Sequence, residues 1–289
     1  MLKIGIIGAD NSHALAFSKL ANLSAEEGGS GLPVQVTAIW GEKPERAELV
    51  ARASNIPTVV ANKKDLLGCV DAVMIVLRHG AEHYDAALPY VQAGIPTWVD
   101  KPFTIDIAQS EALVAAANAA GSVLAGGSTC KYCGDVLQIR NKRLEMSNRG
   151  ALISAALNFP GELNSPYGGL YFYAGHAVEI LTTIFGEGIR SVKADITAGN
   201  VIAIFKYDSF AVSVNFAETT QFYCTLYTNQ EVASLPIDIS DAYRHGFEKF
   251  VRSALCGISP EPLSTLIRPV RILNALICAV ESGQQETVY

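Results

Sequence analysis

Apolar and polar positions follow two different periods along the first part of the chain. Short apolar segments with the length of β-strands alternate with segments that carry Ala, Leu and Glu at helical spacing. The predicted strands cover residues 2–7, 33–40, 72–77, 97–100 and 122–125, with a short one near Thr58, and the predicted helices cover 12–23, 44–54, 82–93 and 107–120. Because residues 4–7 and 73–77 are apolar without alternation, both faces of the sheet should be buried. The pattern predicts an α/β domain at residues 1–126, with a Rossmann-type doubly wound parallel sheet.

The pattern changes after Gly126-Gly127. Helical spacing covers residues 135–146 and part of 168–185, and from residue 192 to 232 apolar and polar residues alternate as they do in half-buried strands. Turn pairs such as Gly199-Asn200 and Asp208-Ser209 join neighbouring strands, which favours antiparallel pairing. Helices over 241–256 and 263–282 end the chain. We therefore predict a second domain at residues 127–289, of α+β class, with a largely antiparallel sheet that is open on one face.

Composition narrows the class of protein. The 289 residues are enough for two domains, and 49% apolar against 17% charged residues favours compact cores and a subunit interface over disorder. A net charge of −6 without a cluster of Lys and Arg argues against nucleic acid as a partner. The first apolar run is too short for a signal sequence and no membrane span is expected, so we expect a cytoplasmic protein. Six scattered cysteines indicate reduced thiols, and the Cys130–Cys133 spacing alone, without a second pair, predicts no metal site.

The turn after the first strand is a candidate phosphate-binding site. In a dinucleotide-binding fold, backbone amides of a glycine-rich G-x-G-x-x-G turn face the pyrophosphate at the start of a helix. If Gly8 is the first glycine, Asp10 and His13 occupy the second and third places, and an acidic side chain there would repel a phosphate. A capped helix start without a ligand is the alternative. The candidate cofactor-binding residues of this turn are Gly8, Ala9, Asp10, Asn11 and Ser12.

The end of the second strand normally offers an acid to the adenosine ribose. Gly41 stands at that place, and Glu42 follows one position later. Glu42 could reach a ribose, whereas Lys43 or Arg46 could meet a 2′-phosphate, so the choice between NAD and NADP stays open. A solvated helix start is an equal alternative for this segment.

A longer block of motifs resembles the Gfo/Idh/MocA oxidoreductase family. It consists of a buried strand at 70–77, then His83, then Ala93-Gly94-Ile95-Pro96-Thr97-Trp98-Val99-Asp100-Lys101-Pro102-Phe103, in which Asp100 replaces the Glu of the family's E-K-P strand end. A Lys held by a following Pro at the carboxyl end of a strand points into the ligand crevice of an open α/β sheet. The resemblance implies that Lys101 lies near the nicotinamide and the reacting carbon and is catalytic. A surface lysine is the alternative.

The resemblance also implies functions for two further segments. The stretch 168–179 is similar to the family's G-G-x-x-x-D-x-G-x-H helix, which makes His176 the general base, while Phe172 takes the place of the Asp one turn earlier. Tyr171, Tyr173 or Glu179 could compensate, and a merely structural His176 is the alternative. Arg78-His79-Gly80 stands where the family shows T-P-N; Arg78 could hold a phosphate or carboxylate or pair with Asp100. The further cofactor candidates are Leu77, Arg78, His79, His83, Asp100 and Lys101; the substrate candidates are Lys101, Tyr171, Phe172, Tyr173 and His176.

These residues predict an NAD(P)-dependent dehydrogenase that acts on a secondary alcohol of a sugar, cyclitol or related polyol. A ligand-sensing or regulatory member of the same fold is the alternative, motivated by Asp10, His13, Gly41 and Phe172. Glycoside hydrolysis through transient oxidation by a tightly held NAD is a third hypothesis. We also expect a homodimer or homotetramer through the sheet of the second domain, where residues 210–216, Phe222-Tyr223 and Tyr227 should form an apolar face.

Overall fold

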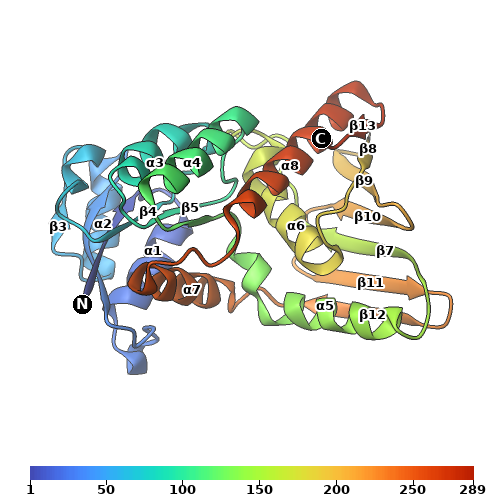
Figure 1. Ribbon diagram of the computed structural model, residues 1–289, viewed down its shortest axis with the longest axis horizontal. Helices are drawn as coiled ribbons and strands as arrows, with labels where there is room; N and C mark the ends of the chain where they lie inside the picture. Colours follow the sequence, from blue (N-terminus) through green and yellow to red (C-terminus); the bar gives the residue numbers. More distant parts are fainter. The chain divides into compact units, whose positions relative to one another are not determined.

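The computed structural model describes all residues, 1–289, and divides into two compact units (Figure 1). Unit 1 comprises residues 1–129 and 243–267, and unit 2 comprises residues 130–242 and 268–289. Unit 1 therefore has a return segment near the end of the chain, which the predicted single boundary after residue 126 assigned to the second domain.

Unit 1 is built on a six-stranded parallel sheet in the order β3-β2-β1-β4-β5-β6. The strand order reverses between β1 and β4, and in such sheets the crevice at the carboxyl ends of these two strands is the ligand-binding position. The strands are β1 (Leu2–Ile7), β2 (Val34–Trp40), β3 (Thr58–Val59), β4 (Ala72–Ile75), β5 (Thr97–Val99) and β6 (Leu124–Gly126). The helices are α1 (Ser12–Asn22), α2 (Pro44–Ala53), α3 (His83–Gln92), α4 (Ile107–Ala120) and α7 (Ala242–Cys256). The predicted doubly wound Rossmann-type sheet is confirmed.

Aromatic packing explains why α7 belongs to unit 1. Phe247 and Phe250 are fully buried; the ring of Phe247 stacks on Phe17 at 6.2 Å between centroids, and Phe250 meets Trp98 edge-on at 6.0 Å. Burying two phenylalanine side chains contributes about 3–6 kcal/mol, enough to hold a helix to the sheet layer that it covers. Helical periodicity located this helix, but periodicity carries no information about which sheet a helix packs against.

Unit 2 is built on a seven-stranded sheet in the order β12-β11-β7-β10-β9-β8-β13. Only β7 and β10 pair in parallel; the other neighbours are antiparallel, so the predicted largely antiparallel sheet is confirmed. The strands are β7 (Leu152–Phe159), β8 (Ser191–Thr197), β9 (Asn200–Lys206), β10 (Ala211–Phe216), β11 (Phe222–Thr228), β12 (Val232–Ile237) and β13 (Glu286–Thr287). The helices are α5 (Gly134–Ser147), α6 (Leu170–Phe185) and α8 (Ile267–Ser282).

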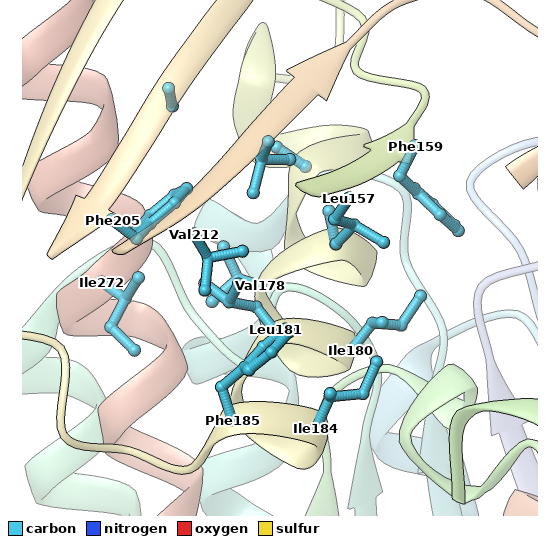
Figure 2. Close-up of a cluster of buried hydrophobic side chains, with 14 of the residues drawn as sticks. Leu157, Phe159, Val178, Ile180, Leu181, Ile184, Phe185, Phe205, Val212 and Ile272 are labelled. Carbon is cyan, nitrogen blue, oxygen red and sulfur yellow. The ribbon is translucent and has the colours of Figure 1, made fainter. Parts of the chain in front are cut away.

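The core of unit 2 lies between one face of this sheet and its helices. Figure 2 shows side chains of α6, among them Val178 and Leu181, pointing toward Leu157, Val212 and Phe205 of the strands. Val212 and Phe205 are directly paired across β10 and β9, and both are fully buried. Residues 174–181 of α6 are all buried, so this helix is fixed on all sides. A side chain on α6 is therefore held rigidly, which suits precise positioning.

The other face of the sheet differs from the prediction. Val212, Val214 and Phe216 of β10 point into the core, and the residues of β10 between them, Ser213 and Asn215, lie on the opposite face. Successive side chains of a strand point to opposite faces of the sheet, and in β10 the apolar side chains are the ones that point into the core. The exposed apolar side chains on this opposite face come from other strands: Ile202 and Ile204 of β9, Tyr223 and Tyr227 of β11, and Val232 of β12.

The last helix also differs from expectation. The segment Leu263–Ser282 is long and apolar enough, by length and composition alone, to cross a membrane, whereas no segment of that length was expected. In the fold, however, Leu273 and Leu276 are buried in the core of unit 2, and Arg268 donates hydrogen bonds to the carbonyl oxygens of Glu187 and Ile189. The apolar character of α8 is thus explained by its place against the core.

Candidate functional site

The turn between β1 and α1 is shaped by one glycine and one asparagine. Gly8 has φ 109°, and a Cβ at this position would lie 2.7 Å from the carbonyl oxygen of Val76 at the end of β4, so only glycine fits. Asn11 is the N-cap of α1: its side-chain oxygen accepts hydrogen bonds from the backbone amides of His13 and Ala14, and its Nδ2 donates to Val76 at 2.6 Å. The turn is therefore fastened to the crevice between β1 and β4, where the pyrophosphate of a dinucleotide binds in folds of this kind.

His13, which stands at the place of the third glycine, forms a buried ion pair. Its Nδ1 lies 2.6 Å from Oδ2 of Asp100, with side chains 8% and 1% exposed. The ring of Tyr243 from α7 meets the His13 ring edge-on at 4.9 Å. His13 thus turns toward the end of β5. Two positions that depart from the motifs that the sequence resembles, His13 in place of Gly and Asp100 in place of Glu, form one interaction. The sequence argument missed it because it considered the two positions separately.

Asp100 lies close to three basic side chains of unit 1. Burial by itself raises the pKa of this carboxyl, but His13 in first place, followed by Lys101 and His83, outweighs burial and holds the pKa of Asp100 below its ordinary value. Lys101, the next residue, is 5% exposed. The carboxylate therefore stays ionised at neutral pH and provides a negative charge beside the Lys101 ammonium.

His83 joins the ends of two strands. Its Nδ1 lies 2.7 Å from the carbonyl oxygen of Pro102 and its Nε2 lies 3.1 Å from that of Leu77, and the residue is fully buried. Burial lowers the pKa of His83, and the contacts with Leu77 and Asp100 offset this only in part. The structure thus places the expected cofactor contacts His83 and Leu77 in a brace that fixes the segment carrying Lys101.

The end of β2 holds the candidate ribose site. A Cβ on Gly41 would lie 2.7 Å from the Cβ of Ala9, so Gly41 permits the end of β2 to pack against the β1–α1 turn. The exposed Glu42 shares a hydrogen bond with Glu82, and burial, followed by the Glu42 carboxylate, raises the pKa of Glu82. Glu82 was not expected at this site; no sequence signal links it to Glu42, because it precedes α3.

Arg78 and His79 follow β4 as expected for residues at the crevice. Both are partly exposed. Nδ1 of His79 accepts a hydrogen bond from the backbone amide of Ala81 and so caps the short 3-10 turn Gly80–Glu82. His79 has a structural task whether or not it contacts a ligand.

In unit 2, His176 lies on α6 and is 7% exposed. Its Nδ1 lies 3.6 Å from the sulfur of Cys130, and its ring meets Tyr173, one turn earlier, edge-on at 5.1 Å. One turn later, Glu179 forms a buried ion pair of 3.5 Å with Lys131. Cys130 and Lys131 are consecutive residues of the 3-10 turn η4 (Thr129–Tyr132), so this turn touches α6 at two points.

The other residues expected to contact a substrate lie in two different surroundings. The hydroxyl of Tyr171 donates to Oδ1 of Asn274 on α8, and the ring of Phe172 packs on Tyr167 at 5.1 Å. Tyr173, in contrast, lines a cavity of about 820 Å³ in unit 2. Burial, and then the neighbouring Cys130 and Glu162, raises the pKa of Tyr173. The cavity is lined by Pro160, Glu162, Tyr173, Glu218, Thr219, Thr220 and Phe222. Glu162 and Glu218 carry no motif, and sequence reasoning missed both.

The six cysteines form no disulfide, and no group of three or more His, Cys, Asp or Glu side chains is arranged to hold a metal ion. The thiol of Cys133 donates to the carbonyl oxygen of Asp238 at 2.7 Å, and burial raises the pKa of this thiol to about 12. Cys130 thus contacts His176, whereas Cys133 bonds to the segment that connects β12 with α7.

Comparison with known proteins agrees with this fold. Residues 2–128 match the model of an oxidoreductase family with an NAD-binding Rossmann fold. UDP-N-acetylglucosamine 3-dehydrogenase of Acidithiobacillus ferrooxidans is 33% identical over 129 residues, which are 44% of this chain and only 36% of that protein's length.

Solved structures resemble the whole chain. Myo-inositol dehydrogenase from Lactobacillus casei, in complex with NAD(H) and myo-inositol, has a TM-score of 0.86 at 13% identity and covers 100% of this chain and 97% of its own. GenD2 from gentamicin A biosynthesis, in complex with NAD, has a TM-score of 0.82 at 15% identity, covering 100% and 96%. At these identities the similarity establishes the shared two-domain fold.

Proposed function

We propose that this chain, whose residues 2–128 match an oxidoreductase family with an NAD-binding Rossmann fold, is an NAD-dependent dehydrogenase of the Gfo/Idh/MocA type that acts on a secondary alcohol of a sugar, cyclitol or related polyol. One observation carries the proposal. The chain retains both side chains that can handle charge and protons in such a reaction, Lys101 after β5 and His176 on α6, and each is more than nine-tenths buried and braced by neighbours.

The β1–α1 turn fits a dinucleotide. The position of Gly8 has no room for a side chain, and α1 begins a few residues after it, so the positive end of the α1 dipole favours a pyrophosphate at this turn. Asp10 is only partly exposed and precedes the N-cap, so the amides rather than a basic side chain must hold the phosphates. NAD would supply a hydride acceptor. The residues that would hold it are Gly8, Ala9, Asp10, Asn11 and Ser12 at the phosphates, Gly41 and Glu42 at the ribose, and Leu77, Arg78 and His79 after β4.

The acids Glu42, after β2, and Glu82, before α3, favour NAD over NADP. Glu42 can accept hydrogen bonds from ribose hydroxyls, and the hydrogen bond with Glu82 places a second carboxyl beside it. A 2′-phosphate carries about two negative charges, so this pair of carboxyl groups would repel it. Lys43 and Arg46, the alternative partners for such a phosphate, lie on the exposed start of α2.

The proposed chemistry divides between the two residues. The imidazole of His176 accepts the proton of the substrate hydroxyl, since its pKa range suits proton transfer near neutral pH. The Lys101 ammonium stabilises the negative charge that develops on the oxygen, and the ionised Asp100 lies beside this lysine. Arg78 remains at the crevice as a candidate for holding a substrate carboxylate or phosphate.

The cavity beside Tyr173 supports a polyhydroxylated substrate. Carboxylates of Glu162 and Glu218 and hydroxyls of Thr219 and Thr220 can accept or donate hydrogen bonds to several hydroxyl groups, while Phe222 offers an apolar wall to a sugar ring. Two of the relatives named above are a myo-inositol dehydrogenase and a UDP-N-acetylglucosamine 3-dehydrogenase, which agrees with this substrate class.

The departures from the family motifs favour retained function over a purely regulatory role. If His13 and Asp100 had drifted without constraint, a buried ion pair between them would not be expected, because a buried charge without a partner is strongly destabilising. The ligand-sensing alternative now depends mainly on Phe172, which leaves His176 without a carboxylate one turn before it.

The test is a fluorescence titration of the purified protein with NADH and with NADPH, followed by a screen of inositols and sugars for NAD-dependent oxidation. We expect NADH to bind more tightly than NADPH and at least one cyclitol or sugar to be oxidised. The absence of binding of both dinucleotides at millimolar concentration would exclude the dehydrogenase. Binding without turnover of any polyol would favour the sensor.

We further propose that the protein is a cytoplasmic homodimer or homotetramer through the outer face of the unit 2 sheet. Six free thiols fit a reducing compartment. Ile202 and Ile204 of β9 and Tyr223 and Tyr227 of β11 are each more than a third exposed, and a second copy could bury them. Light scattering at micromolar concentration should give a dimer or tetramer, and Ile204→Glu should shift it toward the monomer. A wild-type monomer would contradict the proposal.

A further inference from the structure

The immediate surroundings of His176 contain a thiol where a carboxylate is expected. In the motif that this helix resembles, an Asp four residues before the histidine would orient the ring, and here that residue is Phe172. The Nδ1 atom instead lies 3.6 Å from Sγ of Cys130. Cys130 belongs to a different segment, the turn η4, and no spacing in the sequence connects it with His176.

Two contacts fix η4 against α6. Residues 176 and 179 lie one helical turn apart on the same face, and the consecutive residues Cys130 and Lys131 contact them in the same order. The four residues are between 3% and 8% exposed. Because water is largely excluded, the sulfur contact is not readily exchanged for a contact with solvent, and the Lys131–Glu179 pair holds the turn in register.

We propose that Cys130 is a positioning residue for His176, with its sulfur accepting the Nδ1–H of the imidazole. A neutral imidazole carries one proton, so a proton held on Nδ1 leaves Nε2 as the unprotonated atom that can act as a base. The inference rests on the proposed dehydrogenase function for its kinetic meaning. The geometry of the contact, however, is a property of unit 2 alone.

The other groups around His176 are compatible with this assignment. Tyr173 touches the ring, but burial raises the pKa of its phenol, so it stays neutral near pH 7. Phe159 adds an apolar ring at 6.3 Å between centroids. Glu179 lies on the same face of α6, and its charge is compensated by Lys131, while Glu162 acts on Tyr173. The thiol thus gives Nδ1 a polar contact from outside α6.

The direct test is nitrogen NMR of protein labelled with ¹⁵N-histidine, which distinguishes the two tautomers of each ring. Five histidines give few signals, and His176→Asn assigns the one in question. We expect His176 of the wild type to carry its proton on Nδ1 and Cys130→Ala to shift it toward a mixture of tautomers. A wild-type ring protonated on Nε2, or an unchanged tautomer in Cys130→Ala, would overturn the proposal.

The matched control is Cys133→Ser, because Cys133 is also a buried thiol near η4 but donates to the Asp238 carbonyl, a bond that a serine hydroxyl can replace. It should leave the His176 signal unchanged. If Cys130→Ala does not fold, the wild-type tautomer still decides the matter, and Cys130→Ser, whose shorter C–O bond lengthens the contact, provides the second comparison.

Turnover gives an independent readout once a substrate is found. Cys130→Ala should lower kcat on the order of 10-fold to 100-fold with little change in KM, and Cys130→Asp, which supplies a carboxylate acceptor, should recover part of the loss. Equal kcat and pH profiles in the wild type and Cys130→Ala would overturn the positioning role. A protein that oxidises no polyol would disprove the proposed function, whereas the NMR result would still stand or fall by itself.

Discussion

The site-bearing regions of the two units differ in how they accommodate unusual residues. In unit 1, the carboxylate of Asp100 lies against His13 and Lys101, and the nearby ring of His83 lies against two backbone carbonyl oxygens. In unit 2, aromatic rings of Phe159 and Tyr173 lie beside His176, and the thiol of Cys130 contacts it from another segment.

This difference shows that a substituted motif can be compensated in two ways. Around Asp100 the compensation is electrostatic, and electrostatic networks are sensitive to the loss of one member. Around His176 it depends on packing and on a weak hydrogen bond, which should tolerate substitution better while controlling the ring less strictly. Disrupting unit 1 should therefore have larger effects than altering unit 2.

The largest effect is expected for Asp100→Ala. Removing the carboxylate leaves the Lys101 ammonium and the His13 imidazole without their buried partner, which should lower the free energy of unfolding by about 3–5 kcal/mol. Urea denaturation measures the loss. Asp208→Ala is the control, because the ion pair of Asp208 with Arg190 is solvent-exposed and its removal should change stability little. Equal losses in both variants would contradict the electrostatic description of unit 1.

Lys101→Ala should mainly affect catalysis. Without the ammonium, the charge that develops on the substrate oxygen is not stabilised, and kcat should fall about 100-fold to 1,000-fold while NADH still binds. Steady-state kinetics and a fluorescence titration check the two parts. Lys193→Ala, on an exposed position of β8, should retain full turnover. A Lys101→Ala enzyme with near wild-type kcat would show that Lys101 is not catalytic.

The third prediction concerns pH. Because burial lowers the pKa of His83 in the folded protein below its value of about 6.5 in the unfolded chain, the unfolded state binds the proton more readily. The contribution of His83 is complete above about pH 6.5 and is lost as the pH falls toward the folded pKa; that of Asp100, whose pKa is also lowered, is lost only in stronger acid. The Tm should therefore drop between pH 7 and pH 5.

His83→Gln should flatten this part of the Tm profile, although the variant is less stable at every pH because the brace between Leu77 and Pro102 is weakened. His245→Gln, at an exposed position of α7, should keep the wild-type slope. If both variants show the wild-type slope, another group controls the acid sensitivity.

The smallest effect is expected for Phe172→Asp, which makes unit 2 resemble the electrostatic pattern of unit 1. The new carboxylate would lie one turn before His176 and in the first turn of α6, where a negative charge is favourable. The pKa of His176 should rise, and kcat should change by less than about tenfold. NMR titration of the His176 ring measures the change. An unmoved titration would show that residue 172 has no access to the imidazole.

Much of the fold could be predicted from the sequence because its signals are local. Unbroken apolar runs such as 73–77 predicted strands buried on both faces, and alternation over 211–216 predicted a strand with one buried face. The D-K-P strand end and the G-G stretch before His176 identified two candidate catalytic residues. The mistakes concern relations between segments: which unit α7 joins, and which face of β10 is apolar.

The sequence by itself determined the order of the elements, the glycine-dependent turn at Gly8 and the chemical types available for catalysis, because each depends on a few neighbouring residues. Only the tertiary structure decided that His13 pairs with Asp100, that Glu42 meets Glu82, and that Cys130 contacts His176. These partners are 87, 40 and 46 positions apart in the numbering, and no local pattern can join them. They meet because burial of the apolar faces of strands and helices brings distant segments together, and the charged and polar groups then find their partners in the places that packing leaves.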